Sequence, residues 1–385
     1  MSLLYISNIG DINVYWTFKL FLILTLFWCG WAITYKNPNN KYYNCYAAIA
    51  ITVYSIIEGL RWERGIDYRN YYLELTGYWQ KDNIEPFYRL IVDIESSILP
   101  YWMVFILYSA LLMTSFMLVL KHFPKMVIWA LPLFFLITES GAENLVRQFI
   151  AISFFLLGYN AYLKKRKKIM LICFILVPLI HLSGIFVLFI FGLFSLLKLE
   201  EKMSKPWLLL SIYIVLYVVW DISNLSEYTK YLGVISMVSD THLEGYLENA
   251  DRWFTEEGSI SLLHGEKGIA SFANIVFKLL INLTIIYFGF YVCKKNRQMR
   301  IPFWFAYIYI IIQTIGGDIE IYNRLANWLY YLIPLIIGGI LTAIPMNKWE
   351  KKIVYFIVFM AYFYPLIRNI GNMPYSGCAF VWDRI

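Results

Sequence analysis

The chain has 385 residues, of which 60% are hydrophobic and only 15% charged, and its mean hydropathy is +0.58. This composition excludes an ordinary soluble domain, in which about 25% of residues are charged. The net charge of +7 does not require a nucleic-acid partner, because lysine-rich cytoplasmic loops account for most of it. The first 13 residues lack a basic n-region, so we expect the first apolar segment to stay as a transmembrane helix. The five cysteines show no paired spacing and suggest neither a disulfide framework nor a metal site.

Apolar segments recur along the whole chain and predict an all-α, polytopic integral membrane protein with about 12 transmembrane helices. Six basic clusters orient these segments, at 36–41, 121–125, 164–168, 198–205, 294–300 and 348–352. Placing all six inside gives a consistent alternation with both termini outside. We predict one transmembrane domain, 1–385, with outer loops at about 61–84 and 224–270. The segments are 14–34, 43–60, 101–120, 126–138, 148–163, 169–180, 182–197, 206–223, 271–292, 301–316, 325–345 and 353–368.

The region 169–197 is too long for one simple span and too short for two full spans, and both of its flanks are basic. We predict a hairpin that turns back at "PLIHLSG", where Pro178 and Gly184 disfavour an uninterrupted helix. His181 would then lie at the outer tip. The competing interpretation is one tilted helix, which would reverse the orientation of every later loop.

The stretch "IEPFYRLIVDIESSIL" is amphipathic, with Arg89 and Asp93 one turn apart. It predicts a helix that lies in the membrane interface or re-enters the membrane. Glu85 precedes Pro86, and an acid before a proline suits the N-terminus of a helix.

Lysine and arginine are distributed differently. The six inner clusters contain 16 lysines and three arginines, whereas the rest of the chain contains five lysines and nine arginines. Arg147 and Arg324 each precede an apolar run on the predicted outer side. Because arginine binds phosphate oxygens bidentately, this pattern indicates an anionic ligand, most simply a lipid phosphate or diphosphate. The alternative is that these side chains snorkel or pair with acids one turn earlier, Glu143 and Glu320.

Several motifs carry a family resemblance. They are "GIDYRNYY", "IEPFYRLI", "VRQFIAISFFLLGYNAYLKKRKK", "IHLSGIFVLFIF" and "YNRLANWLYYLIP". Their order and spacing, over roughly Ile66 to Pro334, resemble the EpsG/Wzy group of bacterial polysaccharide polymerases.

The resemblance implies a GT-C-like enzyme of the bacterial inner membrane, of the Wzy and O-antigen ligase type, with its active site on the periplasmic side. Such an enzyme transfers a growing glycan from undecaprenyl diphosphate to a sugar hydroxyl of an incoming lipid-linked repeat unit, and undecaprenyl diphosphate leaves. The implied partners are this lipid-linked oligosaccharide, membrane lipids, a chain-length regulator and a flippase. No cofactor, metal or nucleic acid is implied.

The same resemblance suggests roles for individual residues. "RQFIAI" and "YNR" match arginine motifs of the group, so Arg147 and Arg324 are expected to hold the diphosphate and stabilise its leaving. His181, followed by Ser183, matches an H-x-S element and would act as base or phosphate donor; otherwise it is a hydrogen-bonded structural residue. Asp67 is the other candidate base, unless it only caps a helix or shapes a turn.

Further residues of the outer loops complete the predicted site. Arg69 is a third candidate phosphate contact, unless it pairs with Glu63 or Glu74. A platform of tyrosines could stack against the glycan, and the alternative explanation of these residues is an interfacial aromatic belt. The candidate glycan-binding residues are Tyr68, Tyr71, Tyr72, Glu85, Glu320 and Tyr322, and the last two would also orient Arg324.

Three other functions compete with the polymerase. An O-antigen ligase shares the donor and the leaving group but uses a lipid A core acceptor. A lipid-linked oligosaccharide flippase or transporter would favour repeated halves and ionisable groups near the midplane, and no repeat is apparent here. A membrane O-acyltransferase would leave the outer arginines without an obvious role.

Overall fold

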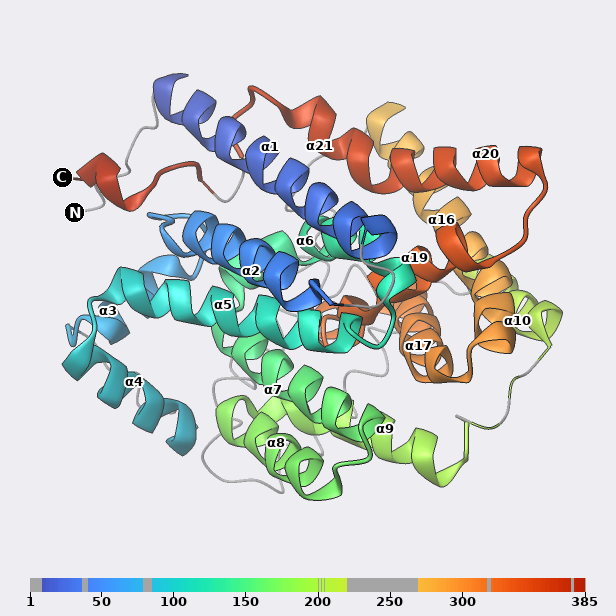
Figure 1. Ribbon diagram of the computed structural model, residues 1–385, viewed down its shortest axis with the longest axis horizontal. Coiled ribbons are helices and arrows are strands. Elements are labelled where there is room, and N and C mark those ends of the chain that lie inside the picture. Colours follow the sequence, from blue (N-terminus) through green and yellow to red (C-terminus); the bar gives the residue numbers. More distant parts are fainter. Residues whose placement is uncertain are drawn as a thin grey trace. The chain divides into compact units, whose positions relative to one another are not determined.

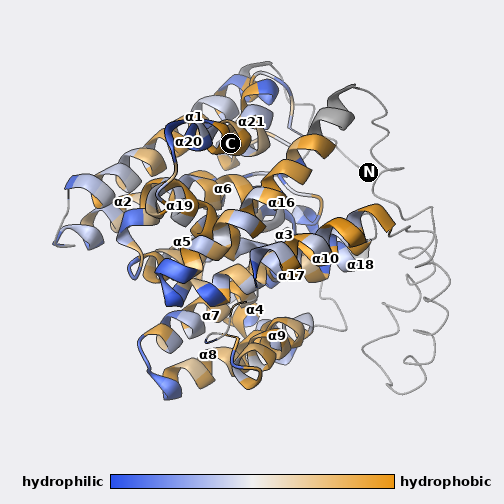
Figure 2. Cartoon of the chain, turned by 90° about the vertical axis from the view of Figure 1, so that its right-hand side faces the viewer, coloured by the Kyte–Doolittle hydropathy of each residue, from blue (hydrophilic) through white to orange (hydrophobic). Residues whose placement is uncertain are grey.

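The computed structural model describes residues 9–36, 41–78, 85–199, 201, 203, 205–219, 269–316, 320–374 and 377–384. Within these residues the chain is built of helices, and the only extended pairing is an isolated antiparallel bridge between Arg61 and Phe380. The predicted all-α class is therefore confirmed for the part of the chain that is described (Figure 1). Coloured by hydropathy, most helices are apolar along much of their length (Figure 2).

The helices belong to two compact units. One comprises residues 1–189, 337–343 and 362–385, and the other comprises residues 190–336 and 344–361. The first unit contains α1 (Ile9–Trp31), α2 (Tyr43–Gly59), α3 (Tyr68–Leu75), α4 (Pro86–Ile98), α5 (Tyr101–Leu120), α6 (Val127–Asn144), α7 (Val146–Leu163), α8 (Lys167–Ile180) and α21 (Tyr364–Asn369). The second contains α10 (Pro206–Val219), α16 (Ile269–Lys295), α17 (Arg300–Gly316), α18 (Glu320–Ala326) and α20 (Lys348–Val358). Two helices, α9 (Ile185–Leu196) and α19 (Ile333–Ala343), cross the boundary between the units.

Each predicted apolar segment overlaps a helix, but not every helix is long enough to span a bilayer. Within the described parts of the chain, six stretches have both the length and the apolar character required: 10–36, 101–120, 124–144, 275–295, 297–316 and 322–343. The apolar helices at 182–196 and 206–219 are shorter. Length and composition of the described helices thus support a membrane protein, and the 12 spans expected from the sequence stay a prediction.

The predicted interruption of 169–197 is confirmed. Helix α8 ends at Ile180, and His181 adopts an extended backbone conformation with φ −151° and ψ 110°. A single 3-10 turn, Leu182–Gly184, precedes α9. Pro178 is accommodated inside α8, so the break follows the proline by three residues. One continuous tilted helix is therefore wrong for this region.

The first unit is held together by successive helix contacts. Helix α1 packs against α2 and α6, α5 packs against α2 and α7, and α7 packs against α8. The C-terminal segment joins this unit through backbone hydrogen bonds, in which Trp62 N–H donates to Ala379 (2.9 Å) and Val381 N–H donates to Leu60 (2.9 Å). Beside them a buried cluster fills the space between α1 and the C-terminal segment; it consists of Tyr15, Trp16, Cys378 and Phe380.

Gly65 allows the loop after α2 to lie directly against the end of α6. Its φ is +101°, a conformation that side-chain-bearing residues rarely adopt. A Cβ at this position would lie 2.5 Å from the carbonyl oxygen of Glu143. The neighbouring Ile66 N–H donates to the Asn144 side chain at 2.5 Å. This close approach brings the start of the 61–84 loop to the break between α6 and α7.

Helix α4 begins at Pro86 with Glu85 in the N-cap position, as the sequence predicts. It buries Tyr88 and Val92 and exposes an apolar stripe with a spacing of four residues, formed by Leu90, Ile94 and Ile98. This arrangement fits the predicted interfacial helix, because an exposed apolar stripe can rest in the lipid boundary. The 61–84 loop contains a short helix, α3, whereas residues 224–268 of the second predicted loop lie outside the described part of the chain.

Candidate functional site

Arg147 stands in the first turn of α7, immediately after a break in the helix. Helix α6 ends at Asn144, and Leu145 has φ −107° and ψ 52°, outside the helical region. The guanidinium Nη1 of Arg147 lies 2.9 Å from Oε2 of Glu85, and each side chain is slightly less than one-fifth exposed. The alternative pairing of Arg147 with Glu143 is not the one the structure has, because the break removes the helical spacing on which that alternative depended.

Glu85 connects three elements through its two carboxylate oxygens. While Oε2 accepts from Arg147, Oε1 accepts a hydrogen bond from the backbone N–H of Leu182 at 3.0 Å. The same Oε1 lies 3.8 Å from Nδ1 of His181, and Ser183 Oγ lies 3.1 Å from that nitrogen. One carboxylate thus ties the start of α4, the start of α7 and the break between α8 and α9. The sequence motifs of Glu85, Arg147 and His181 meet at one site.

Aromatic side chains surround the Arg147 guanidinium. Its carbon lies 5.5 Å from the ring centre of Tyr88, whose hydroxyl donates to Glu74 at 3.4 Å. Tyr71 is also an electrostatic neighbour of Arg147. Burial raises the pKa of Tyr71, and the nearby Arg147 opposes this shift without reversing it. Tyr71 is therefore neutral at pH 7 and can act as a hydrogen-bond donor beside the guanidinium.

Asp67 and Arg69 lie at the start of α3. Asp67 occupies the N-cap position without a side-chain capping bond, although its carboxylate accepts a weak hydrogen bond from Asn70 at 3.5 Å. It is an electrostatic neighbour of Tyr71, which places it near the Arg147 site. Arg69 is exposed, and none of the ion pairs among the described residues involves it. A catalytic role for Asp67 and a phosphate-binding role for Arg69 remain predictions.

The tyrosines of the predicted glycan platform are engaged in packing. Tyr68 is 1% exposed and stacks on Phe105 at a centroid distance of 5.2 Å. Tyr71 is 8% exposed. Tyr72 is half-buried and meets the rings of Trp62 and Tyr101 edge to face, at 5.3 and 4.8 Å. The rings of Tyr68 and Tyr72 thus pack against other aromatic rings and Tyr71 is buried, and glycan binding by the three stays a prediction.

Arg324 lies in α18, in the other unit from Arg147. Its side chain is half-buried. The Tyr322 ring packs closely against Gly316 at the end of α17, within 3 Å of where a Cβ would stand. The side chain of Glu320 lies outside the described residues, so its predicted pairing with Arg324 stays a prediction. The same is true of a clamp that combines Arg147 and Arg324.

A buried network of charged side chains lies next to this site and was missed in the sequence. Lys19 is fully buried on α1, with Nζ 2.7 Å from Glu58, 3.7 Å from Glu143 and also in contact with Glu139. Arg64, also fully buried, lies 3.6 Å from Glu143. The sequence signal was available, because Lys19 and Glu58 stand inside apolar segments and ionisable groups in such positions are rare.

This network has a structural consequence for the site. Removing charges from water is costly, and the cost is offset only when opposite charges and hydrogen bonds surround them. Here the charges come from α1, α2, α6 and the loop after α2, so the network fixes the position of α6 just before the break that carries Arg147.

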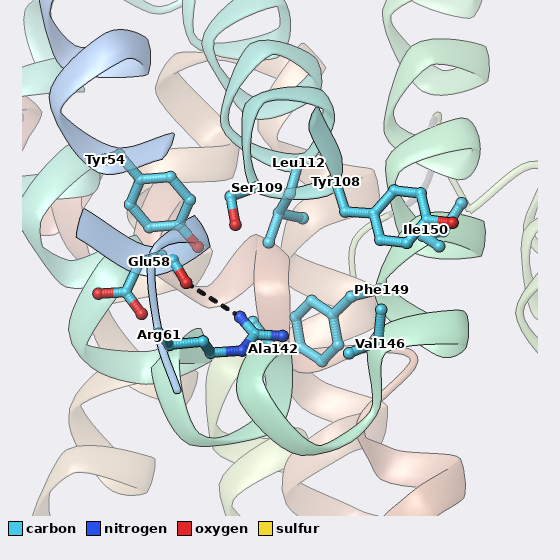
Figure 3. A pocket seen from close by; sticks show the side chains of 10 residues that line it. All are labelled: Tyr54, Glu58, Arg61, Tyr108, Ser109, Leu112, Ala142, Val146, Phe149 and Ile150. Carbon is cyan, nitrogen blue, oxygen red and sulfur yellow. Dashed lines mark hydrogen bonds between the residues drawn. The ribbon is translucent and has the colours of Figure 1, made fainter. Parts of the chain in front are cut away.

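A small pocket opens between α2, α5, α6 and α7 beside the network (Figure 3). Arg61 lies along it and donates to the carbonyl oxygen of Glu58 at 3.3 Å. The volume that a water molecule's centre can occupy is about 20 Å³, enough for about one water but far too little for a lipid diphosphate. Among the described residues, no group of three or more His, Cys, Asp or Glu side chains is placed to hold a metal ion.

The helices and the charged site together indicate the class of protein. It is a membrane protein whose apolar helices support a cluster of an arginine, a carboxylate and a histidine. A comparison with protein families then identifies the group. The model of the EpsG family matches residues 44–380, and the chain belongs to this family. The match extends beyond the 66–334 region in which the motifs were recognised. No curated protein and no solved structure matches the chain.

Membership of the EpsG family indicates a polysaccharide polymerase-like function of the glycosyltransferase type. The apolar helices agree with this assignment, since they indicate a protein embedded in a membrane.

Proposed function

We propose that this protein is a GT-C-like polymerase of the bacterial inner membrane, with about 12 spans, that joins oligosaccharide repeat units carried on undecaprenyl diphosphate. The acceptor is the sugar hydroxyl of a second lipid-linked unit, and the reaction takes place on the periplasmic side. The observation that carries the proposal is the partly buried Arg147 guanidinium, bound by the carboxylate of Glu85 beside the His181 turn.

The Arg147 site is suited to an anionic leaving group. A guanidinium presents parallel N–H donors that fit carboxylate and phosphate oxygens alike. In the structure one of these donors, Nη1 of Arg147, is bound to Glu85. A diphosphate oxygen would replace Glu85 at Arg147, with Arg324 as the proposed second contact. The positive charge would then stabilise the negative charge that grows on the diphosphate as its bond to the sugar breaks.

The proposed chemistry is a single glycosyl transfer. The acceptor hydroxyl oxygen forms a bond with the anomeric carbon of the donor glycan. The bond between that carbon and the diphosphate oxygen breaks, and its electron pair leaves with undecaprenyl diphosphate. The hydroxyl proton passes to a base on the protein.

His181 is the base we propose, with Asp67 as the alternative. If Nδ1 of His181 carries the hydrogen and donates a hydrogen bond to Ser183 Oγ, Nε2 presents a free electron pair to the acceptor hydroxyl. The negative charge of Glu85, whose Oε1 is fixed by the Leu182 N–H 3.8 Å from Nδ1, would favour this tautomer. After the exchange at Arg147, the Glu85 carboxylate would also stabilise the imidazolium that forms.

The test is reconstitution of the purified full-length protein with a lipid-diphosphate-linked repeat unit, followed by a gel that resolves glycan ladders. Wild type, Arg147→Ala and Arg368→Ala would be compared, with folding checked by size exclusion. Arg368 is an exposed arginine to which no role is assigned. We expect ladders from wild type and Arg368→Ala only.

Other results would redirect the assignment. Glycan transfer only after addition of a lipid A core would identify a ligase. No transfer to either acceptor by well-folded protein would favour a transporter of lipid-linked oligosaccharides. An Arg147→Ala protein that misfolds would remove the support for Arg147 as a phosphate-binding residue.

A further inference from the structure

The second unit contains a larger pocket, between the C-terminal end of α16 and the start of α20. It has a volume of about 410 Å³, within the range of roughly 300–1,000 Å³ that is typical of small-molecule sites. Its walls combine aromatic and aliphatic side chains with charged groups at the helix ends. They are formed by Tyr287, Phe288, Tyr291, Lys294, Lys295, Ile344, Pro345, Met346 and Glu350.

One wall is a single face of α16. Tyr287, Tyr291 and Lys294 follow one another at spacings of four and three residues, so they stand one above the other on the helix. The Tyr287 and Tyr291 rings contact each other edge to face at 5.4 Å. Along this face the wall changes from aromatic to cationic at the point where the candidate span 275–295 ends. A ligand on this wall would meet an apolar surface first and an ammonium group at the end.

The charges around the pocket are predominantly positive. Lys294 and Lys295 line it, and α20 begins beside it with Lys348, Lys351 and Lys352. Of these lysines, Lys294 and Lys295 are the ones that line the pocket, and the second basic cluster stands on the helix that contributes Glu350 to it. Glu350 is the opposing charge, and its carboxylate accepts from the backbone N–H of Asn347 at 2.9 Å in a capping box.

We propose that this pocket binds an anionic phospholipid, with its phosphate at Lys294 and Lys295 and the start of an acyl chain along Tyr291, Phe288 and Tyr287. The pocket lies at the ends of the candidate spans 275–295 and 322–343, where a lipid headgroup region would be. Both basic clusters belong to the set that the charge distribution places on the cytoplasmic side, whose leaflet is rich in anionic lipid. A lipid uses both the cationic and the apolar wall, whereas inorganic phosphate would use only the cationic one.

The test is native mass spectrometry of the purified full-length protein, titrated with phosphatidylglycerol or with phosphatidylcholine of the same acyl chains. We expect preferential binding of phosphatidylglycerol to wild type. In Lys294→Gln/Lys295→Gln its affinity should fall roughly thirtyfold, about fivefold for each lysine. The matched control is Lys167→Gln/Lys168→Gln, which removes the same charge from an exposed pair on α8.

A second variant has the opposite expected sign. Glu350→Gln removes the negative charge at the pocket, and glutamine can retain the capping box. The affinity of this variant for phosphatidylglycerol should rise by about fivefold. This measurement tests the lipid site on its own if the double lysine variant fails to fold.

Four outcomes would overturn the proposal. They are equal binding of the two lipids, an equal loss in the Lys167/Lys168 control, displacement of the lipid by millimolar inorganic phosphate, and unchanged or weaker binding in Glu350→Gln.

Discussion

Glu85 and Arg147, 62 positions apart in the chain, form an ion pair with 2.9 Å between Oε2 and Nη1. The pair closes the start of α4 onto the start of α7, and the second oxygen of Glu85 holds the backbone of Leu182. The Arg147 guanidinium thereby holds a carboxylate of the protein in the place proposed for phosphate.

Glu85→Gln should lower kcat by roughly a hundredfold or more, because the amide cannot stabilise a protonated His181. It should not raise KM, because Arg147 loses its carboxylate partner and becomes more available to phosphate. The measurement is initial rates of ladder formation over a range of donor concentrations. A rise in KM with unchanged kcat would instead assign Glu85 to glycan binding. Loss of the charged hydrogen bond should also lower the free energy of unfolding by about 1.5–3 kcal/mol.

Arg147→Lys separates charge from geometry at the same position. Lysine keeps the positive charge but not the planar fork, so activity should fall by roughly ten- to a hundredfold, less than in Arg147→Ala. Thermal melting curves of the two variants should coincide within a few degrees. Full activity of the lysine variant would show that the fork is not required.

Arg324→Ala should abolish polymer while the protein level stays near normal, as expected for a second diphosphate contact. If both arginines act on one leaving group, Arg147→Ala/Arg324→Ala should be little worse than either single variant. Residual activity is measured by ladder formation under single-turnover conditions. Strictly multiplicative losses would indicate that the two residues act independently.

Lys19→Met should destabilise the first unit by about 3–5 kcal/mol, because it leaves buried carboxylates at Glu58 and Glu143 without their shared cation. In the double variant Lys19→Met/Glu58→Gln, the Glu58→Gln change should recover part of the lost stability, because it removes one of the buried carboxylates. Lys41→Met, at an exposed position, is the control and should cost less than about 1 kcal/mol. Thermal unfolding in detergent measures all three, and equal behaviour of Lys19→Met and Lys41→Met would contradict the structural role of the network.

Glu95 on α4 gives a prediction about pH. Burial raises its pKa, although a hydrogen bond from Tyr108 acts in the other direction. A carboxyl whose pKa is higher in the folded protein stabilises the fold while it is protonated. Its contribution to the free energy of unfolding is complete below the ordinary glutamate pKa of about 4.3, and it is lost as pH rises through the raised pKa. Glu95→Gln should therefore be more stable than wild type at pH 7. The advantage should shrink as pH falls towards 4, as measured by melting temperature, and an advantage independent of pH would exclude this explanation.

The sequence determined the helical class, the membrane character and the family. Long apolar runs can satisfy backbone hydrogen bonds in lipid only as helices, so the pattern alone was sufficient. The break at His181 was also local information, since Pro178 and Gly184 stand close to it. The sequence did not determine the number of spans, because an apolar run does not show whether the helix it forms is long enough to cross the bilayer. Helix α8, for example, has 14 residues and α9 has 12.

Only the tertiary structure decided which charges meet. Helical spacing favoured Glu143 as the partner of Arg147, yet the break at Leu145 turns Arg147 towards Glu85 and leaves Glu143 with Lys19 and Arg64. Each of these contacts joins residues far apart in the chain, and ion pairing depends on distances of a few ångströms. Periodicity reports which face of a helix a residue occupies, whereas the packing of α1, α2, α4, α6 and α7 determines what that face meets.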